Sequence, residues 1–242
     1  MEGAGPLANS RSTALAPRLS QVALLPAEPG RPGARRLLEA AVAAFAERGY
    51  HGVSVRDLTS VVGIKAGSFY SHFSSKEQLL AELMVLGHQA HQAHVRDAIL
   101  GAGADPEEQL RAAVRANVSF HGTWPLLTVV CNSELHALAP ENRDRVVSLR
   151  HDSGVLVAAV IERGNAAGVF SCDDTWLALS AIAGMGVRVA WWYRQPGALN
   201  ADSPLDSYPG QAAAWLPKAD HSIEAIADAY AEFALKIVGA RP

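Results

Sequence analysis

The sequence predicts an all-α fold of about nine helices. Apolar residues recur with the helical period over most of the chain between residues 34 and 238. Ser or Asp residues that suit helix N-caps, often followed by Pro or by Glu/Gln, precede these periodic segments. No stretch alternates apolar and polar residues for long enough to indicate a strand.

The N-terminal end is predicted to lack a fold of its own. Residues 1–32 are rich in Pro, Gly and Ala and have no apolar periodicity, so we expect a disordered arm there. A first helix follows, and Gly49 provides its C-terminal stop. Its apolar face is formed by residues at helical spacing, namely Ala34, Leu37, Leu38, Ala41 and Phe45.

Two short helices are predicted directly after the first. Ser54 is placed as the N-cap of a helix that runs to Val62, Gly63 ends it, and a third helix is expected over residues 65–72. Two helices of this length joined by a tight turn are typical of a helix-turn-helix. Residues 33–80 are therefore predicted to form a three-helix domain of that kind.

The remaining residues, 81–242, are predicted to form a larger helical domain. Ser75 and Gln78 have the spacing of a capping box, in which the serine accepts from the third amide and the glutamine reaches back. The helix that they open is expected to extend to Leu100. Further helices are predicted to start near Pro106, Pro125, Pro140 and Asp173.

Charge is distributed unevenly along this chain of 242 residues, whose net charge is −3. Residues 31–80 contain seven Lys and Arg against four Asp and Glu, whereas the rest of the chain is acidic. A basic module on an acidic body is what a DNA-binding protein would show. Cys131 and Cys172 fit neither a disulfide framework nor a zinc pattern.

The sequence indicates neither a membrane span nor a secretion signal. The longest uncharged apolar run, Thr175–Val187, is shorter than the ~18 residues that a membrane span needs. The N-terminus lacks the basic-then-apolar order of a signal peptide. We therefore expect a cytoplasmic protein without a membrane partner.

The stretch VVGIKAGSFYSHFSSKEQLL, residues 61–80, combines a helical glycine with polar side chains. On a helix, Phe69 and Phe73 share one side and anchor it, while Gly67 and Ser71 lie opposite. A glycine weakens a helix by about 1 kcal/mol, but it allows close approach to a sugar-phosphate wall or a base edge. The third helix is therefore the candidate for reading double-stranded DNA, although a tight corner between helices would also use a glycine.

Residues 34–80 resemble the DNA-binding domain of the TetR family of bacterial transcriptional regulators. The pieces that match are AAFAERGYHGVSVRDL, GIKAGSFYSHF and SKEQLL. Lys65 departs from the pattern, since the family usually has Ser or Thr there. The resemblance implies that DNA is lined by Ser54, Lys65, Ala66, Gly67, Ser68, Tyr70, Ser71, His72 and Lys76.

The same resemblance implies a C-terminal domain that binds a small ligand and dimerises through its last two helices. Residues 174–194 are apolar on nearly every side, so this helix needs cover from all directions. Together with an amphipathic last helix near 222–238, it would form a four-helix interface across a two-fold axis, which predicts a homodimer and a palindromic operator. The Pro-rich stretch 195–220 between them is predicted to be a long loop.

The segments NSELHALAPENRDRVVSLR, VIERGNAAGVF and WWYR resemble TetR-type regulators of fatty-acid and steroid breakdown. That resemblance implies a repressor released by a small hydrophobic effector of the acyl-CoA class. Candidate effector-binding residues are Trp124, Arg188, Trp191 and Tyr193. Each has a structural alternative, because aromatics at helical spacing are more often core residues and a buried arginine usually pairs with a carboxylate.

Two other functions stay open at this stage. His88, His91 and His94 recur every third residue, so adjacent pairs such as His88 and His91 could serve a metal-responsive regulator. A helical interaction protein without sequence-specific DNA binding would also explain the dimer surface. An enzyme is not expected, because no catalytic or dinucleotide motif occurs, and no cofactor or resident metal is predicted.

Overall fold

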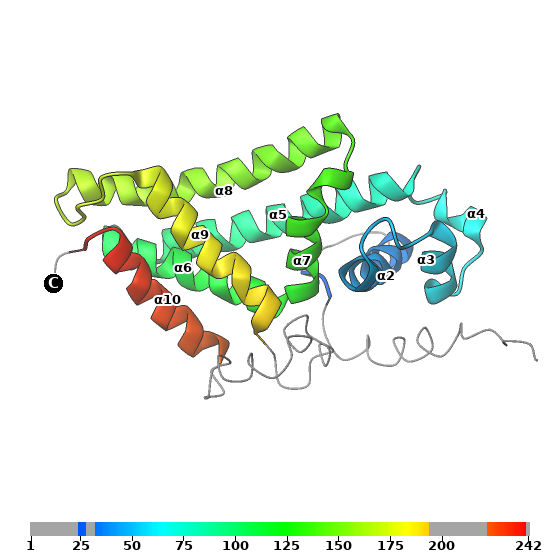
Figure 1. Ribbon diagram of the computed structural model, residues 1–242, viewed down its shortest axis with the longest axis horizontal. Helices are drawn as coiled ribbons and strands as arrows, with labels where there is room; N and C mark the ends of the chain where they lie inside the picture. The colour runs from blue at the N-terminus through cyan, green and yellow to red at the C-terminus, as the bar shows by residue number, and fades with distance from the viewer. Residues whose placement is uncertain (1–23, 28–31, 194–221, 241–242) are drawn as a thin grey trace, which may run out of the picture.

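The structure, a computed structural model, describes residues 24–27, 32–193 and 222–240. Within these ranges it contains nine α-helices, a short 3-10 helix and no strand, which confirms the prediction of an all-α fold. Figure 1 shows α2, α3 and α4 grouped at one end, with the remaining helices forming an elongated body beside them.

The first three helices are α2 (Pro32–Arg48), α3 (Val55–Val62) and α4 (Ala66–Phe69). Helix α3 begins with a capping box, because the Asp57 amide donates to Ser54 Oγ at 3.2 Å and the Ser54 amide donates to Asp57 Oδ2 at 2.8 Å. It ends at Gly63, whose φ of 75° is the left-handed conformation that glycine favours. The helix-turn-helix geometry is thus encoded within a few residues on each side of the turn.

Helix α4 is shorter than the predicted 65–72. Its regular part stops at Phe69, and Tyr70–His72 form turns in which the Tyr70 amide donates to the Gly67 carbonyl. The Lys65 N-cap has no side-chain hydrogen bond to the helix, since a lysine cannot accept from the free amides.

The prediction of a disordered arm over 1–32 is wrong for residues 24–27. Leu24 and Leu25 are buried in the core beneath α2, and the Arg35 guanidinium donates to the carbonyls of Leu25 and Pro26 at 3.2 and 3.0 Å. Two adjacent leucines have no periodicity to reveal them, so only the tertiary contact identifies this segment. The rest of that prediction, residues 1–23 and 28–31, lies outside the described residues, as does the whole of the predicted loop 195–220.

Helix α5 (Lys76–Gly101) connects the two parts of the molecule. Its N-cap forms only half of the predicted capping box: the Gln78 amide donates to Ser75 Oγ at 3.0 Å, but the Gln78 side chain accepts from Ser74. Near its start, Leu79 and Leu80 belong to a core shared with α2, and near its end Val95 and Ile99 belong to a second core.

The body consists of α6 (Pro106–Thr123), α7 (Pro125–Ser133), α8 (Pro140–Ala166), α9 (Thr175–Trp192) and α10 (Ile223–Ile237), with the 3-10 helix Leu135–Ala137 before α8. Proline occupies the first turn of α6, α7 and α8, as their start signals predicted. Figure 1 shows α8 running along α5, and α9 and α10 crossing α6. No helix in the described ranges is long and apolar enough to cross a bilayer.

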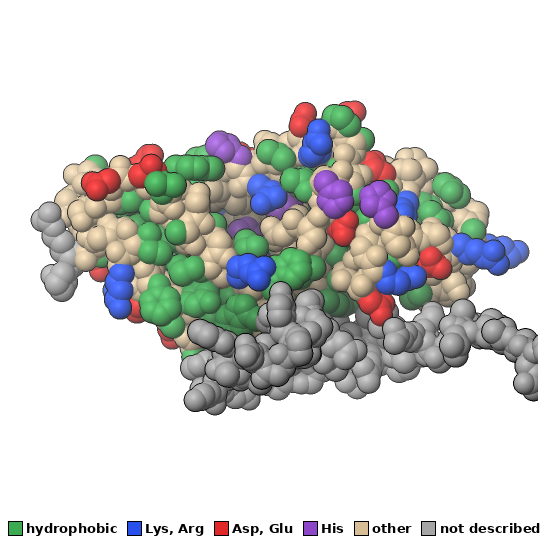
Figure 2. Space-filling view, in the orientation of Figure 1, with side chains coloured by type: hydrophobic (Ala, Val, Ile, Leu, Met, Phe, Trp, Pro, Cys, Tyr) green, Lys and Arg blue, Asp and Glu red, His purple; other side chains and the backbone are tan. Residues whose placement is uncertain are grey.

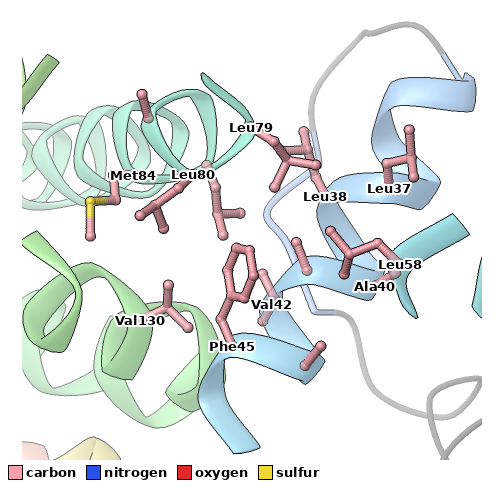
Figure 3. Close-up of a cluster of buried hydrophobic side chains, with 14 of the residues drawn as sticks. Leu37, Leu38, Ala40, Val42, Phe45, Leu58, Leu79, Leu80, Met84 and Val130 are labelled. Carbon is pink, nitrogen blue, oxygen red and sulfur yellow. The ribbon is translucent and has the colours of Figure 1, made fainter. Parts of the chain in front are cut away.

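The first core joins the N-terminal helices to the body. Figure 3 shows Phe45 of α2 directed toward Leu80 of α5 and Val130 of α7, all of which are buried. Because this core is continuous across the junction, the orientation of the N-terminal helices depends on the positions of α5 and α7.

Lys76 fixes the start of α5 to the turn before α3. Its ammonium donates to the carbonyls of Tyr50 and Val53 at 2.9 and 2.6 Å and lies 3.9 Å from the centroid of the Tyr50 ring. Burial lowers the pKa of Lys76, consistent with an ammonium that is partly withdrawn from water.

Replacing Lys76 with alanine is expected to destabilise the protein by about 1–3 kcal/mol, because two carbonyls lose a charged donor. Chemical denaturation followed by circular dichroism measures the change. Lys65→Ala is the matched control, since Lys65 is exposed and its loss should change stability by no more than about 0.5 kcal/mol. Equal denaturation midpoints for the two variants would contradict this structural role of Lys76.

Candidate functional site

An exposed polar surface lies at the end of the molecule formed by α3 and α4. Lys65, Ala66, Gly67, Ser68 and Tyr70 are all exposed. A Cβ atom built on Gly67 would meet no atom within 4 Å, so this position faces open space. Nothing in the described protein therefore prevents a large partner from approaching the backbone there.

Two buried rings hold this surface in place. Phe69 and Phe73 are 0% and 1% exposed, and their ring centroids are 5.7 Å apart. They face the core while Gly67 and Ser71 are exposed, which is the division that the helical spacing predicted. Tyr70, beside them, is 60% exposed.

The other predicted DNA-lining residues already have partners within the protein. Ser54 Oγ donates to Asp57 Oδ2 at 2.7 Å, and Ser71 Oγ donates to the Ser68 carbonyl at 2.7 Å. The His72 ring packs closely against Gly33, and the Lys76 ammonium is held by the two carbonyls described above. Their side chains are therefore less available to a partner than those of Lys65, Ser68 and Tyr70.

Arg56 is an exposed basic residue on this surface that the sequence-based set left out. It lies in the first turn of α3, two residues after the Ser54 cap. Hydrogen bonds from Ser54 are the main cause of the lowered pKa of Asp57, and the charges of Arg48 and Arg56 add to it. The signal in the sequence was a basic residue two positions after a predicted N-cap. Arg36, in contrast, donates to the Val62 carbonyl at 2.6 Å and serves to cap α3.

A cavity of about 600 Å³ lies within the body, far along α5 from this surface. Helices α5, α6 and α7 form its inner wall, and α8 and α9 form its outer wall. Most of its lining is apolar, including Val95, Val114, Phe120, Leu127, Leu179 and Ile182. A cavity of this size and polarity suits a small hydrophobic ligand.

The inner wall also contains a group of histidines. His91 Nε2 lies 3.0 Å from Asn117 Oδ1, and His121 Nδ1 lies 2.8 Å from the Asn117 carbonyl oxygen. Since oxygen accepts in both contacts, we assign a proton to each of these two ring nitrogens. His88 Nε2 is buried and has no hydrogen-bond partner within geometric limits among the described residues, although an interaction of the ring with the Cys131 backbone opposes the fall in its pKa.

These histidines are electrically neutral at physiological pH. Burial, together with the positive charge of Arg150, lowers the pKa of His88 to about 3. Burial, followed by the influence of His91, lowers the pKa of His121 to about 4, and burial also lowers the pKa of His91. The inner wall is therefore polar but uncharged.

The mouth of the cavity has a different character. Arg150 and His151 of α8 and Trp176 of α9 line it and are exposed. Within the described ranges, Arg150 takes part in no salt bridge. Figure 2 views this face and shows histidine atoms, in purple, inside a hollow that has Lys or Arg side chains, in blue, on its border.

None of the four predicted effector-binding residues lines this cavity. Trp124 packs on Phe120 with ring centroids 4.7 Å apart, Tyr193 is buried in the second core, and Arg188 is exposed with its guanidinium 5.7 Å from the Trp191 ring. The cavity-facing positions of α9 instead include Leu179, Ala183 and Val187, one turn apart. A helix that is apolar on all sides gave no indication of which face would turn inward.

The metal alternative gains no support. The described residues contain no group of three or more His, Cys, Asp or Glu side chains placed to hold a metal ion. His88 and His91 both line the cavity, but His91 is engaged with Asn117. What His88 and His91 share is therefore a position in the cavity wall.

Comparison with known proteins gives this arrangement a family. Residues 37–83 match the profile described as bacterial regulatory proteins of the tetR family, and residues 103–214 match the tetracyclin repressor-like C-terminal domain. The HTH-type transcriptional repressor KstR2 of Mycobacterium tuberculosis strain H37Rv is 32% identical over 183 residues, which are 74% of this chain and 91% of that protein. This chain belongs to the TetR family.

Solved structures agree with the TetR assignment. A TetR-family regulator from Rhodococcus RHA1 superimposes with a TM-score of 0.74 and 25% identity, covering 88% of this chain and all of that one. AibR, solved with isovaleryl coenzyme A and operator DNA, has the same fold, with a TM-score of 0.68 and 20% identity over 86% of this chain and 99% of AibR. The curated relatives of this TetR protein are transcriptional regulators, so the family is not one of enzymes.

Because His88 and His121 are buried in the neutral form, we expect the folded protein to lose stability in acid. Below about pH 6.5 the unfolded chain binds protons that buried His88 and His121 cannot take up until their own lower pKa values are reached. Stability should be highest above this pH and fall between about pH 6.5 and 4, by up to ~1.4 kcal/mol per pH unit for each histidine.

Denaturation measured at a series of pH values tests this expectation. The double variant His88→Leu/His121→Leu should lose less stability on acidification than the wild type. His94→Leu is the control, because His94 is exposed on the same helix as His88. Parallel pH dependences for the wild type and the double variant would rule out these histidines as the cause.

Proposed function

We propose that this protein is a repressor that binds a palindromic operator as a homodimer and is released from it by a small hydrophobic effector. The observation that carries the proposal is the pairing of an exposed polar reading surface with an internal cavity along one continuous helix, α5. The relative KstR2 is named a transcriptional repressor, which supports repression rather than activation.

In the proposed complex, α4 and the turn after it enter the major groove. Gly67 allows the backbone to come close to the DNA, and Lys65, Ser68 and Tyr70 reach phosphates and base edges. Arg56 and the cap at Ser54 meet the backbone beside them. Side chains such as Lys76 and His72 act mainly by holding this surface in shape.

The homodimer is proposed to form through α9 and α10. Both helices expose large apolar side chains in the single chain: Trp176 and Leu177 are 66% and 65% exposed, and Phe233 and Ile237 are 44% and 38% exposed. Apolar side chains of this size on two adjacent helices are expected to be covered in the working protein. A two-fold axis across them would form a four-helix interface and present two reading surfaces to a palindrome.

The effector is proposed to be an acyl-CoA thioester. The apolar walls would take the acyl group, and the exposed Arg150 at the mouth, which forms no salt bridge with the described residues, would receive a phosphate of the coenzyme. AibR, which has the same fold, was solved with isovaleryl coenzyme A, and this supports the class of ligand.

A route from the cavity to the DNA surface follows from the contacts of α8. The Glu77 carboxylate, at the start of α5, accepts from the Ala139 amide at 2.9 Å and from the Asn142 side chain at 3.0 Å, at the start of α8. An effector that separates α8 from α5 would shift this junction and change the spacing of the two reading surfaces. Such an effector would shift the protein toward the separated arrangement of α5 and α8 only to the extent that it binds that arrangement more tightly than the closed one.

The DNA-binding proposal is tested by fluorescence anisotropy with DNA fragments from around the protein's own gene. The double variant Lys65→Ala/Tyr70→Phe should weaken binding about tenfold or more and reduce the slope of log K against log salt by about 1, because one phosphate contact is lost. Arg96→Ala on α5 is the control and should bind as the wild type does, because Arg96 is exposed and lies outside the surface around Gly67 and outside α9 and α10. Addition of acyl-CoAs should release the wild type, and persistence of the complex with every thioester would remove that effector class.

The dimer proposal predicts that charged residues on α9 and α10 will separate the subunits. Leu177→Glu/Phe233→Glu should sediment as a monomer in analytical ultracentrifugation, since two carboxylates per chain would be buried in the interface. Leu100→Glu is the control, because Leu100 is 71% exposed at the far end of α5. A dimer that persists in the double variant would place the interface elsewhere.

A further inference from the structure

The cavity combines two kinds of polar groups at different depths. Arg150 lies exposed at the mouth, whereas His88 projects from α5 in the inner wall and is only 9% exposed. The wall between them is lined by apolar side chains such as Val114, Leu127 and Leu179. A ligand that fills this space meets a cation at the entrance, hydrocarbon along the walls and an imidazole in the inner wall.

His88 differs from the other buried polar side chains of this wall. His121 is bonded to the Asn117 carbonyl, Thr128 donates to the carbonyls of Trp124 and Pro125, and Ser153 donates to that of Leu149. His88 Nε2 alone among these four residues belongs to the buried polar atoms that have no partner in the described protein. A buried polar atom without a hydrogen bond costs roughly 1–3 kcal/mol, so a group that supplies the bond is stabilised there.

The chemistry of the missing partner follows from the surroundings. A second cation is disfavoured by the nearby positive charge of Arg150, which already acts on His88. A buried carboxylate would meet uncharged histidines, which offer no full counter-charge in the inner wall. In a neutral imidazole one ring nitrogen donates and the other accepts, so Nε2 does one or the other according to the tautomer. A hydroxyl suits Nε2 in either tautomer, and a carbonyl oxygen suits it where Nε2 carries the proton.

We propose that His88 selects effectors that carry a hydroxyl or carbonyl oxygen on their hydrophobic part, in addition to the anionic group that Arg150 receives at the mouth. The proposal rests on the cavity being the effector site, as proposed above. It narrows the effector class from hydrophobic thioesters in general to oxygenated ones. An unsubstituted hydrocarbon chain would fill the space but leave His88 Nε2 without a partner.

Matched pairs of ligands test the selection directly. Hexanoyl-, octanoyl- and decanoyl-CoA and their ω-hydroxy counterparts place a terminal oxygen at three depths, and isothermal titration calorimetry gives Kd for each. At one chain length or more, the wild type is expected to bind the hydroxylated ligand about five- to tenfold more tightly, as one net hydrogen bond provides. His88→Leu should remove or reverse that preference, whereas His94→Leu, on the same helix but outside the cavity, should keep it.

Failure of the role proposed for His88 can be distinguished from failure of the proposed repressor function. Release from DNA by thioesters with no preference for the hydroxyl group in the wild type would overturn the role of His88 and leave the repressor intact. That comparison needs no variant, so it holds even if His88→Leu does not fold. The same titrations with the free fatty acids and ω-hydroxy acids separate the groups: a hydroxyl preference seen only there, and lost in His88→Leu, keeps His88 and removes the thioester.

Discussion

The burial of α5 in two separate hydrophobic cores is the constraint on which the rest of the structure depends. Leu79 and Leu80 pack against the N-terminal helices, while Val95 and Ile99 pack within the body. Because interiors are close-packed, neither end can move without repacking a core. One stiff helix therefore relates the exposed surface around Gly67 to the cavity wall that contains His88.

A second connection runs beside the first and closes a loop of contacts. Helix α8 holds Glu77 at its own N-terminus and supplies Arg150 to the mouth of the cavity, which lies between α8 and α5. The cavity thus lies between two helices that meet again at the end of the molecule that carries Gly67 (Figure 1). Under the proposed function, a ligand that fills the space would change the separation of these helices.

The cavity itself is stable for a simple electrostatic reason. Burial keeps its histidines neutral, and Arg150 lies at the exposed mouth rather than in the inner wall. An inner wall with a charged group would pay a large desolvation penalty in the absence of ligand. Hydrogen bonds that His91 and His121 donate to oxygens of Asn117 keep the wall ordered without adding charge.

The sequence alone determined the features whose causes lie within a few residues of one another. The cap at Ser54, the left-handed turn at Gly63 and the inward side of Phe69 and Phe73 follow from local hydrogen bonds and from helical spacing. The family resemblance over residues 34–80 rests on the same local features and was correct. Even there, the local pattern overestimated the length of α4. The chain continues as turns after Phe69, and Phe73 still faces the core there, so the spacing of the two rings does not reveal where the helix ends.

Only the tertiary structure decided which side chains surround the cavity and which buried leucines precede α2. His88, Asn117 and His121 come together because α5 and α6 pack side by side, and no spacing along the chain encodes that contact. Arg188 and Trp191 lie away from the cavity because a helix that is apolar on every side does not reveal its inner face. The division has one physical reason: caps and turns are formed by neighbours in sequence, whereas a ligand site is formed by the packing of distant helices.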